Sequence, residues 1–193
     1  LGALAIIHRY MTVAEQTHIV TDLKNETGSI IGAAIGTGRE NLTRARCLAK
    51  AGIDVLCIDV AHGHHVAVKE LIGELRTLSE FDNVHIMAGN VATSEAVEDL
   101  ASWGANSIRI GIGGGSICST RIQTSHGVPT LQSVIDCAAA ADACGVKIIA
   151  DGGIRNSGDI VKSYAAGADF VMLGSMLAGT TEAPGRIISL GDR

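Results

Sequence analysis

A cysteine stands in a loop made mostly of glycine and serine. The run Gly111-Ile112-Gly113-Gly114-Gly115-Ser116-Ile117-Cys118-Ser119-Thr120-Arg121 follows the apolar, strand-like segment 106–110. Glycines allow positive φ angles and a close approach of the backbone to a ligand, and Ser116 and Thr120 place hydroxyls near the thiol. The alternative is that Cys118 is only a small residue in a tight turn. Since nothing in such a loop would bury the side chain, we predict that Cys118 is a nucleophile beside a phosphate-binding site.

Two glycine-containing turns follow neighbouring apolar runs further along the chain. Asp151-Gly152-Gly153 ends one run and Gly174-Ser175 ends the next. Backbone N–H groups in such turns bind phosphate where no side chain obstructs the approach. Either turn alone could be a purely structural tight turn. The two together, at the same end of adjacent strands, favour a phosphate site, with Asp151 accepting hydrogen bonds from ribose hydroxyls.

Further polar side chains stand at the ends of apolar runs. Asp59 opens the segment Asp59-Val60-Ala61-His62-Gly63-His64-His65, which lacks the Cys partners or spaced His partners of a closed zinc site. We therefore expect Asp59 to hold a ribose or a nicotinamide group rather than a metal ion. Asn90 and Arg109 are expected to contact the substrate or to support the residues that do.

The elements that must position these residues alternate regularly. Short runs rich in Val and Ile are separated by longer amphipathic stretches, which indicates a parallel sheet covered by helices. The expected strands are 3–8, 29–35, 55–59, 84–88, 107–111, 147–151 and 170–173. The expected helices are 13–24, 39–51, 65–78, 94–102, 131–144 and 157–166.

Seven units of similar size favour an α/β fold of the (β/α)8 TIM-barrel type over an open flavodoxin-like sheet. Such a barrel has eight units over ~250 residues. We therefore expect residues 1–193 to be a fragment of one catalytic barrel domain, incomplete at both ends, without the first strand and the final helix. The polar and glycine-rich segments follow their strands, which places them on the C-terminal face, where barrel active sites form.

Composition narrows the class of protein. The 193 residues carry a formal net charge of −5 and have no basic stripe, which argues against nucleic acid as a partner. No run reaches the ~18 apolar residues of a membrane span, so no membrane contact is expected. The five cysteines are an odd number and show no CxxC pair, which suits a reducing cytoplasm.

Four segments, in a consistent order along the chain, resemble the IMP dehydrogenase/GMP reductase family. They are the run from Gly111 to Arg121, Asp151-Gly152-Gly153, Val171-Met172-Leu173-Gly174-Ser175 and Thr180-Thr181-Glu182-Ala183-Pro184-Gly185. The resemblance implies a (β/α)8 barrel in homotetramers. It also implies oxidoreductase chemistry at carbon 2 of a purine nucleotide, IMP or GMP, with NAD or NADP as the cofactor.

The resemblance also implies roles for individual residues. Cys118 matches the cysteine that attacks carbon 2, and Thr120 matches a nearby catalytic threonine. Asp151 falls on the ribose-binding aspartate, and Asp59 and Asn90 match residues near the nicotinamide and the reacting base. The nucleotide phosphate site falls on Ser116, Gly152, Gly153, Gly174 and Ser175. A monovalent cation site, for K+, falls on the backbone carbonyls of Gly113, Gly115 and Cys118.

The direction of the reaction stays open at the level of sequence. The run 32–38 and the segment 180–185 resemble dehydrogenases, whereas 58–63 resembles reductases. The helix 13–24 leaves no room for the CBS-domain pair that most dehydrogenases insert after it. IMP dehydrogenase is the first prediction and GMP reductase the alternative. A non-catalytic nucleotide-binding fragment and a flavin-dependent phosphate-binding barrel are the remaining possibilities.

Overall fold

A single parallel sheet forms the centre of the computed structural model, which describes residues 3–183. The seven strands lie in the order of the sequence, and each pairs with the next in parallel. The strands are β1 (Ala5–Ile7), β2 (Ile31–Ile35), β3 (Val55–Asp59), β4 (His85–Val91), β5 (Ser107–Ile110), β6 (Lys147–Asp151) and β7 (Phe170–Met172).

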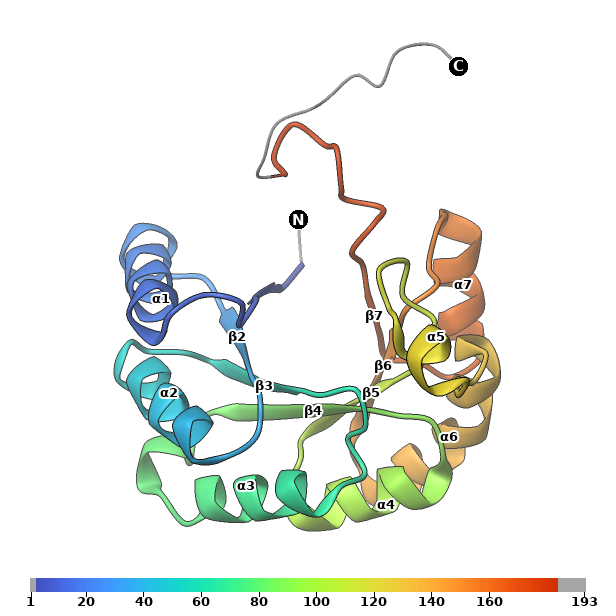
Figure 1. The fold of residues 1–193 in the computed structure, drawn as a ribbon, viewed down its shortest axis with the longest axis horizontal. Coiled ribbons are helices and arrows are strands. Elements are labelled where there is room, and N and C mark those ends of the chain that lie inside the picture. The colour runs from blue at the N-terminus through green and yellow to red at the C-terminus, as the bar shows by residue number, and fades with distance from the viewer. Residues whose placement is uncertain (1–2, 184–193) are drawn as a thin grey trace.

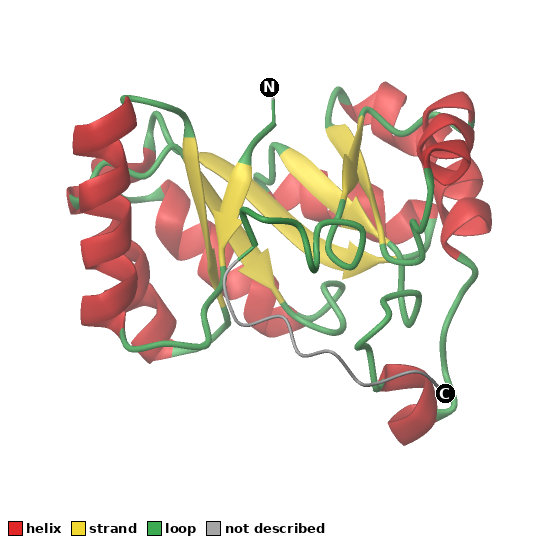
Figure 2. Ribbon diagram, turned by 90° about the horizontal axis from the view of Figure 1, so that it is seen from above, coloured by secondary structure: helices red, strands yellow, loops and turns green. Residues whose placement is uncertain are grey.

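The helices cover the outer face of the sheet, which curls into a half barrel with β1 and β7 at its two ends (Figure 1). Seen from above, the strands lie between flanking helices (Figure 2). The helices are α1 (Val13–Thr27), α2 (Arg39–Lys50), α3 (Val66–Arg76), α4 (Ser94–Trp103), α5 (Thr120–Thr124), α6 (Thr130–Cys144) and α7 (Ser157–Ala165), with a short 3-10 helix, η1, at Ser79–Phe81.

The predicted α/β barrel architecture is confirmed. An open doubly wound sheet reverses its strand order at a switch point, whereas this sheet runs from β1 to β7 without reversal. All seven predicted strands and six predicted helices are present, with ends that differ by a few residues. The sequence prediction missed α5 and η1, because segments of five and three residues are too short to show a hydrophobic period.

Local signals explain where the helices begin and end. Thr12 and Glu15 form a reciprocal capping box at the start of α1, and Thr93 caps α4 through the N–H of Ala96. The glycines that precede β3, β5 and β7 all have positive φ, with 109° at Gly104 and 106° at Gly167. These turns end a helix and send the chain into the next strand, as the recurring sequence pattern predicts.

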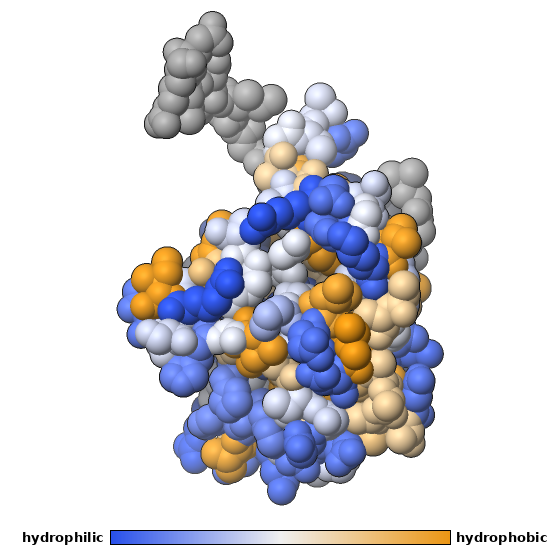
Figure 3. Space-filling model, turned by 90° about the vertical axis from the view of Figure 1, so that its right-hand side faces the viewer, coloured by the Kyte–Doolittle hydropathy of each residue, from blue (hydrophilic) through white to orange (hydrophobic). Residues whose placement is uncertain are grey.

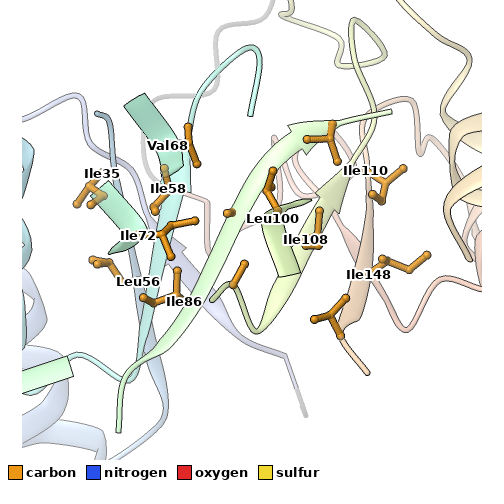
Figure 4. Close-up of a cluster of buried hydrophobic side chains, with 14 of the residues drawn as sticks. Ile35, Leu56, Ile58, Val68, Ile72, Ile86, Leu100, Ile108, Ile110 and Ile148 are labelled. Carbon is orange, nitrogen blue, oxygen red and sulfur yellow. The ribbon is translucent and has the colours of Figure 1, made fainter. Parts of the chain in front are cut away.

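Successive residues of the strands pack alternately into two separate apolar layers. The larger layer packs between the sheet and the helices, and Figure 4 shows Ile58, Ile86 and Ile108 of the sheet near Ile72 and Leu100 of the helices. A smaller cluster lies inside the curl of the sheet: Ala34, Val55, Cys57, Met87 and Ile149. Each fully buried aliphatic side chain contributes ~1.5–3 kcal/mol, so the larger layer is the main source of stability.

Some apolar side chains remain exposed on the side of the molecule formed by α5, α6 and α7. Figure 3 shows hydrophobic surface on this side, to which Ile122, Ile135 and Val161 contribute. Within residues 3–183, none of the helices is both long enough and apolar enough to cross a membrane.

A buried glutamine attaches α1 to the first two strands. Gln16 is fully buried, and its Nε2 donates to the carbonyls of Ile7, His8 and Ala34 at 3.3, 3.2 and 2.9 Å. Its Oε1 accepts a hydrogen bond of 2.7 Å from Arg44 of α2. One amide therefore satisfies strand-end carbonyls on β1 and β2 and links two helices to them.

Replacing this amide should destabilise the fold. We expect Gln16→Leu to lower the free energy of unfolding by about 2–3 kcal/mol, because buried carbonyls and a guanidinium lose their partner. The measurement is urea unfolding, with the exposed Gln132→Leu on α6 as the matched control. Gln132 bonds only to Asp136, so its loss should cost no more than about 0.5 kcal/mol. Equal effects of the two substitutions would contradict this account of Gln16.

Candidate active site

The carboxyl ends of the strands and the loops that follow them line a cavity of about 790 Å³. Side chains or backbone from β3, β4, β5, β6 and β7 all reach it, as a barrel's C-terminal face predicts. Of the predicted site residues, Thr120 alone does not line the cavity. All the others line it: Asp59, Asn90, Arg109, Gly113, Gly115, Ser116, Cys118, Asp151, Gly152, Gly153, Gly174 and Ser175.

The thiol of Cys118 lies next to the first residue of α5. Its Sγ is 3.3 Å from Oγ1 of Thr120, and its N–H donates to the carbonyl of Gly115 at 3.2 Å. Hydrogen bonds from the hydroxyl and the N–H of Thr120 lower the pKa of Cys118, with smaller contributions from the N–H of Gly113 and the charge of Arg121. The thiolate is the reactive form of cysteine, so this environment favours a nucleophile.

The nucleophile loop packs backbone to backbone on the turn after β6. A Cβ atom on Gly152 would lie 2.8 Å from the backbone nitrogen of Gly115, and Gly152 has a φ of 93°. Only glycine satisfies both conditions. An antiparallel bridge between Ile112 and Val128 closes the base of the loop. The two glycine segments that the sequence singled out separately are therefore in direct contact.

A buried guanidinium joins two of the predicted binding carboxylates. Arg109 of β5 contacts Asp59 of β3 at 2.8 Å through Nη1 and Asp151 of β6 at 2.7 Å through Nη2. Burial opposes the charge, but the Cys57 sulfur and the two carboxylates outweigh it, so the pKa of Arg109 is raised. Burial in turn raises the pKa of Cys57. Arg109 stays charged and fixes both carboxylates at the floor of the cavity.

Glycine at one position allows this contact to cross a strand. The backbone register aligns Asp59, Gly89 and Arg109 on three successive strands, so β4 stands between the two ionic partners. A Cβ on Gly89 would lie 2.7 Å from the Cβ of Arg109. The missing side chain leaves room for the guanidinium to reach over β4. Arg109 was expected to contact the substrate or to support the residues that do, but its ion pairs with Asp59 and Asp151 were not predicted.

Asn90 completes the same network from β4. Its Nδ2 donates at 2.8 Å both to the carbonyl of Gly111 and to Oδ2 of Asp151. Its Oδ1 is buried and has no hydrogen-bond partner among the described residues. A buried acceptor that faces no donor is costly unless a ligand supplies one. The Oδ1 atom of Asn90 is therefore a candidate acceptor for an N–H group of a ligand.

Sequence reasoning missed Arg9, which follows β1 and also lines the cavity. Its Nε lies 3.5 Å from Oδ2 of Asp59, and its guanidinium lies over the ring of Tyr10, 5.1 Å from the centroid. The available signal was its position: Arg9 lies just beyond the end of β1, at the same edge of the sheet where Asp59 and Asp151 end β3 and β6.

One of the histidines after β3 contacts α4. His64 Nε2 lies 2.7 Å from Asp99 of α4, and its ring packs 5.8 Å from the ring of Trp103. Across residues 3–183, no group of three or more His, Cys, Asp or Glu side chains is arranged to hold a metal ion.

The contact between Cys118 and Thr120 predicts that the pKa of the thiol depends on the threonine hydroxyl. Because the threonine hydroxyl stabilises the thiolate, Thr120→Val should raise the thiol pKa and shift the pH midpoint of Cys118 alkylation upward. Thr120→Ser should keep the midpoint of the parent. Thr124→Val is the matched control, since that hydroxyl bonds the carbonyl of Thr120 and not the thiol. An unchanged midpoint in Thr120→Val would refute this assignment.

Comparison with known proteins agrees with this geometry. The family model described as "IMP dehydrogenase / GMP reductase domain" matches residues 1–193. The chain is 53% identical over 159 residues to a GMP reductase of Leishmania major, covering 82% of this chain and 32% of that protein. It is 50% identical over 166 residues to an inosine-5'-monophosphate dehydrogenase of Aquifex aeolicus, covering 86% of this chain and 34% of that protein.

A similar inosine-5'-monophosphate dehydrogenase of Haemophilus influenzae is 52% identical over 165 residues, or 85% of this chain. The chain spans about a third of the length of these relatives. The family match extends over the whole sequence and includes every segment that lines the cavity. The chain therefore belongs to the IMP dehydrogenase/GMP reductase family.

Proposed function

We propose that this chain carries the nucleotide-binding and nucleophile-bearing part of a purine nucleotide oxidoreductase, acting as an IMP dehydrogenase. The observation that carries the proposal is the thiol of Cys118, whose pKa is lowered, at the edge of a cavity that two glycine turns also line. The substrates are IMP, a nicotinamide dinucleotide and water, and the product nucleotide is XMP.

The thiolate supplies the covalent step. The sulfur of Cys118 adds to carbon 2 of the base, and the carbon–nitrogen double bond at that carbon becomes a single bond. NAD, when bound, accepts the hydrogen of carbon 2 with its electron pair. The carbon–nitrogen double bond then re-forms while the sulfur remains attached. Water adds to carbon 2, the sulfur–carbon bond breaks, one proton is released, and the thiolate is regenerated with XMP.

The turns after β6 and β7 are proposed to bind the nucleotide. Ser116, Gly152, Gly153, Gly174 and Ser175 offer a hydroxyl or N–H group to the phosphate. Within the described residues, a Cβ on Gly174 would meet no atom within 4 Å, which leaves space for a phosphate oxygen. Asp151 is proposed to accept hydrogen bonds from the ribose, and Arg109 and Asn90 hold its carboxylate in place.

The other half of the cavity is proposed to hold the nicotinamide end of the cofactor. Asp59 and Asn90 both line the cavity, and Oδ1 of Asn90 has no hydrogen-bond partner among the described residues. A K+ ion on the carbonyls of Gly113, Gly115 and Cys118 stays a prediction, as do the homotetramer and the cytoplasmic location. In the structure the Gly115 carbonyl accepts a hydrogen bond from the N–H of Cys118, and a carbonyl oxygen has a second lone pair.

GMP reductase is the second candidate, and the Leishmania relatives support it. There the thiolate adds to carbon 2 of GMP, ammonia leaves, NADPH supplies a hydride to that carbon, and the thiolate departs to give IMP. Both reactions use the same nucleophile. Assays of the intact protein with IMP and NAD, and with GMP and NADPH, distinguish them by NADH formation or by ammonia release.

The test of the proposal is removal of the nucleophile in the intact protein. We expect Cys118→Ala to reduce turnover to less than a tenth of the parent rate, because no covalent adduct forms, while nucleotide binding stays largely unchanged. Cys144→Ala, at an exposed cysteine of α6, is the matched control. Turnover above a tenth of the parent rate, or equal losses in both variants, would exclude Cys118 as the nucleophile.

The phosphate assignment has its own test at Gly174. A valine side chain at position 174 would occupy the space proposed for a phosphate oxygen. We therefore expect Gly174→Val to weaken nucleotide binding by at least about tenfold and to leave nucleoside binding unchanged. This corresponds to the loss of one charge-assisted hydrogen bond of ~1.5–3 kcal/mol. IMP and inosine are each titrated against the parent protein and against Gly174→Val, and circular dichroism checks that the variant is folded. Equal losses for the two ligands would show that this turn does not hold the phosphate.

A further inference from the structure

Two cations line the cavity within the described part of the chain, and only one is fully engaged by protein groups. Arg109 uses Nε, Nη1 and Nη2 on two carboxylates. Arg9 has one ionic partner, Asp59, at 3.5 Å, and its buried Nε makes no hydrogen bond to any described residue. Arg9 therefore lines the cavity and donates no hydrogen bond to the described residues.

We propose that Arg9 binds the diphosphate group of the dinucleotide cofactor. This inference rests on the proposed function, because it takes the cavity to hold a nicotinamide dinucleotide. A guanidinium binds phosphate oxygens through paired N–H donors, and a buried donor left unpaired is costly. The diphosphate is common to NAD and NADP, so the assignment holds for either reaction.

The position of Arg9 suits this group. The nucleotide phosphate is assigned to the turns after β6 and β7, at the opposite end of the sheet from β1. Asp59, which is assigned to the nicotinamide side, is the direct neighbour of Arg9. A cofactor whose nicotinamide end lies at Asp59 and Asn90 brings its diphosphate within reach of the adjacent strand ends. Arg9 is the cation at those strand ends that donates no hydrogen bond to the described residues.

The neighbours of Arg9 other than Asp59 contact its guanidinium without accepting a hydrogen bond from it. The ring of Tyr10 lies against it, with the Cζ atom 5.1 Å from the centroid. Its Nη1 lies beside Gly36 at the end of β2, where a Cβ would come within 3.5 Å. Stacking and a nearby glycine orient the group and take up none of its donors. A structural arginine such as Arg44 differs, since it donates to Gln16 and to the carbonyl of Met11.

The competing role for Arg9 is to position Asp59 and touch no ligand. The two roles predict different sets of ligands whose affinity depends on Arg9. A diphosphate contact affects only ligands that carry phosphate, whereas a positioning contact affects every ligand that Asp59 holds, including the phosphate-free nicotinamide riboside. A comparison of these two ligands separates the roles.

The experiment measures equilibrium binding in the intact protein with Cys118→Ala as the background, so that no turnover occurs. With IMP saturating, calorimetry gives the affinity for NAD and for nicotinamide riboside. Arg9→Met removes the charge and keeps the length, and Arg9→Lys restores a charge. Arg46→Met, which breaks the surface ion pair between Arg46 of α2 and Glu80 of η1, is the control for loss of one positive charge.

We expect Arg9→Met to weaken NAD by about tenfold or more, the loss of one charge-assisted hydrogen bond, and to leave nicotinamide riboside and IMP within about twofold. Arg9→Lys should recover part of the NAD affinity. The salt dependence of NAD binding should also decrease in Arg9→Met, since a charge contact is screened by salt. Arg46→Met should match the background.

Two results would overturn the proposal. Equal losses for NAD and nicotinamide riboside would make Arg9 a positioning residue for Asp59. Unchanged NAD affinity would remove Arg9 from the site. Both results leave the proposed function intact, because IMP binding and the effect of Cys118→Ala are measured separately. Failure of the parent to bind IMP would instead refute the proposed function and, with it, this inference.

Discussion

Burial of the Arg109 charge is the constraint on which the site depends. A guanidinium away from water needs anionic partners, and here they come from β3 and β6. Loss of Arg109 would remove the shared cationic partner of both carboxylates and leave Asp59 with Arg9 at 3.5 Å and Asp151 with the amide of Asn90. Breaking a buried ion pair typically costs about 3–5 kcal/mol. The same contacts that stabilise the strand ends therefore fix Asp59 and Asp151, the two carboxylates assigned to ligand binding.

The barrel geometry makes this arrangement possible. Parallel strands end at one edge, so residues distant in the sequence meet at the cavity. Two apolar layers below it hold the strands in register, and Gly89 leaves the path over β4 open. Gln16 performs a similar task at β1, where one amide connects two strands to two helices. Apolar packing thus holds the strands together, and polar contacts at the strand ends fix the positions of those ends.

Much of this architecture could be predicted from the sequence, because continuous apolar runs, helix-ending glycines and polar strand ends are local signals. The seven strands, the six longer helices and the barrel type follow from them. The pairing of Arg109 with Asp59 could not be predicted, since it depends on a three-strand register and on the space above Gly89. The contacts of Gln16 with two strands and of Arg9 with Asp59 likewise join segments distant in the sequence, so a local pattern indicates at most the position of these residues.

The contact between Gly152 and the nucleophile loop links substrate recognition to catalytic geometry. No side chain separates the two segments, so a shift of the turn after β6 is transmitted through rigid backbone to the segment that carries Cys118. Under the proposed function, the phosphate of the substrate would press on the same turn that sets the distance of the sulfur from carbon 2. A nucleoside would then lose rate as well as affinity, because binding energy far from the reacting atom is used to align it.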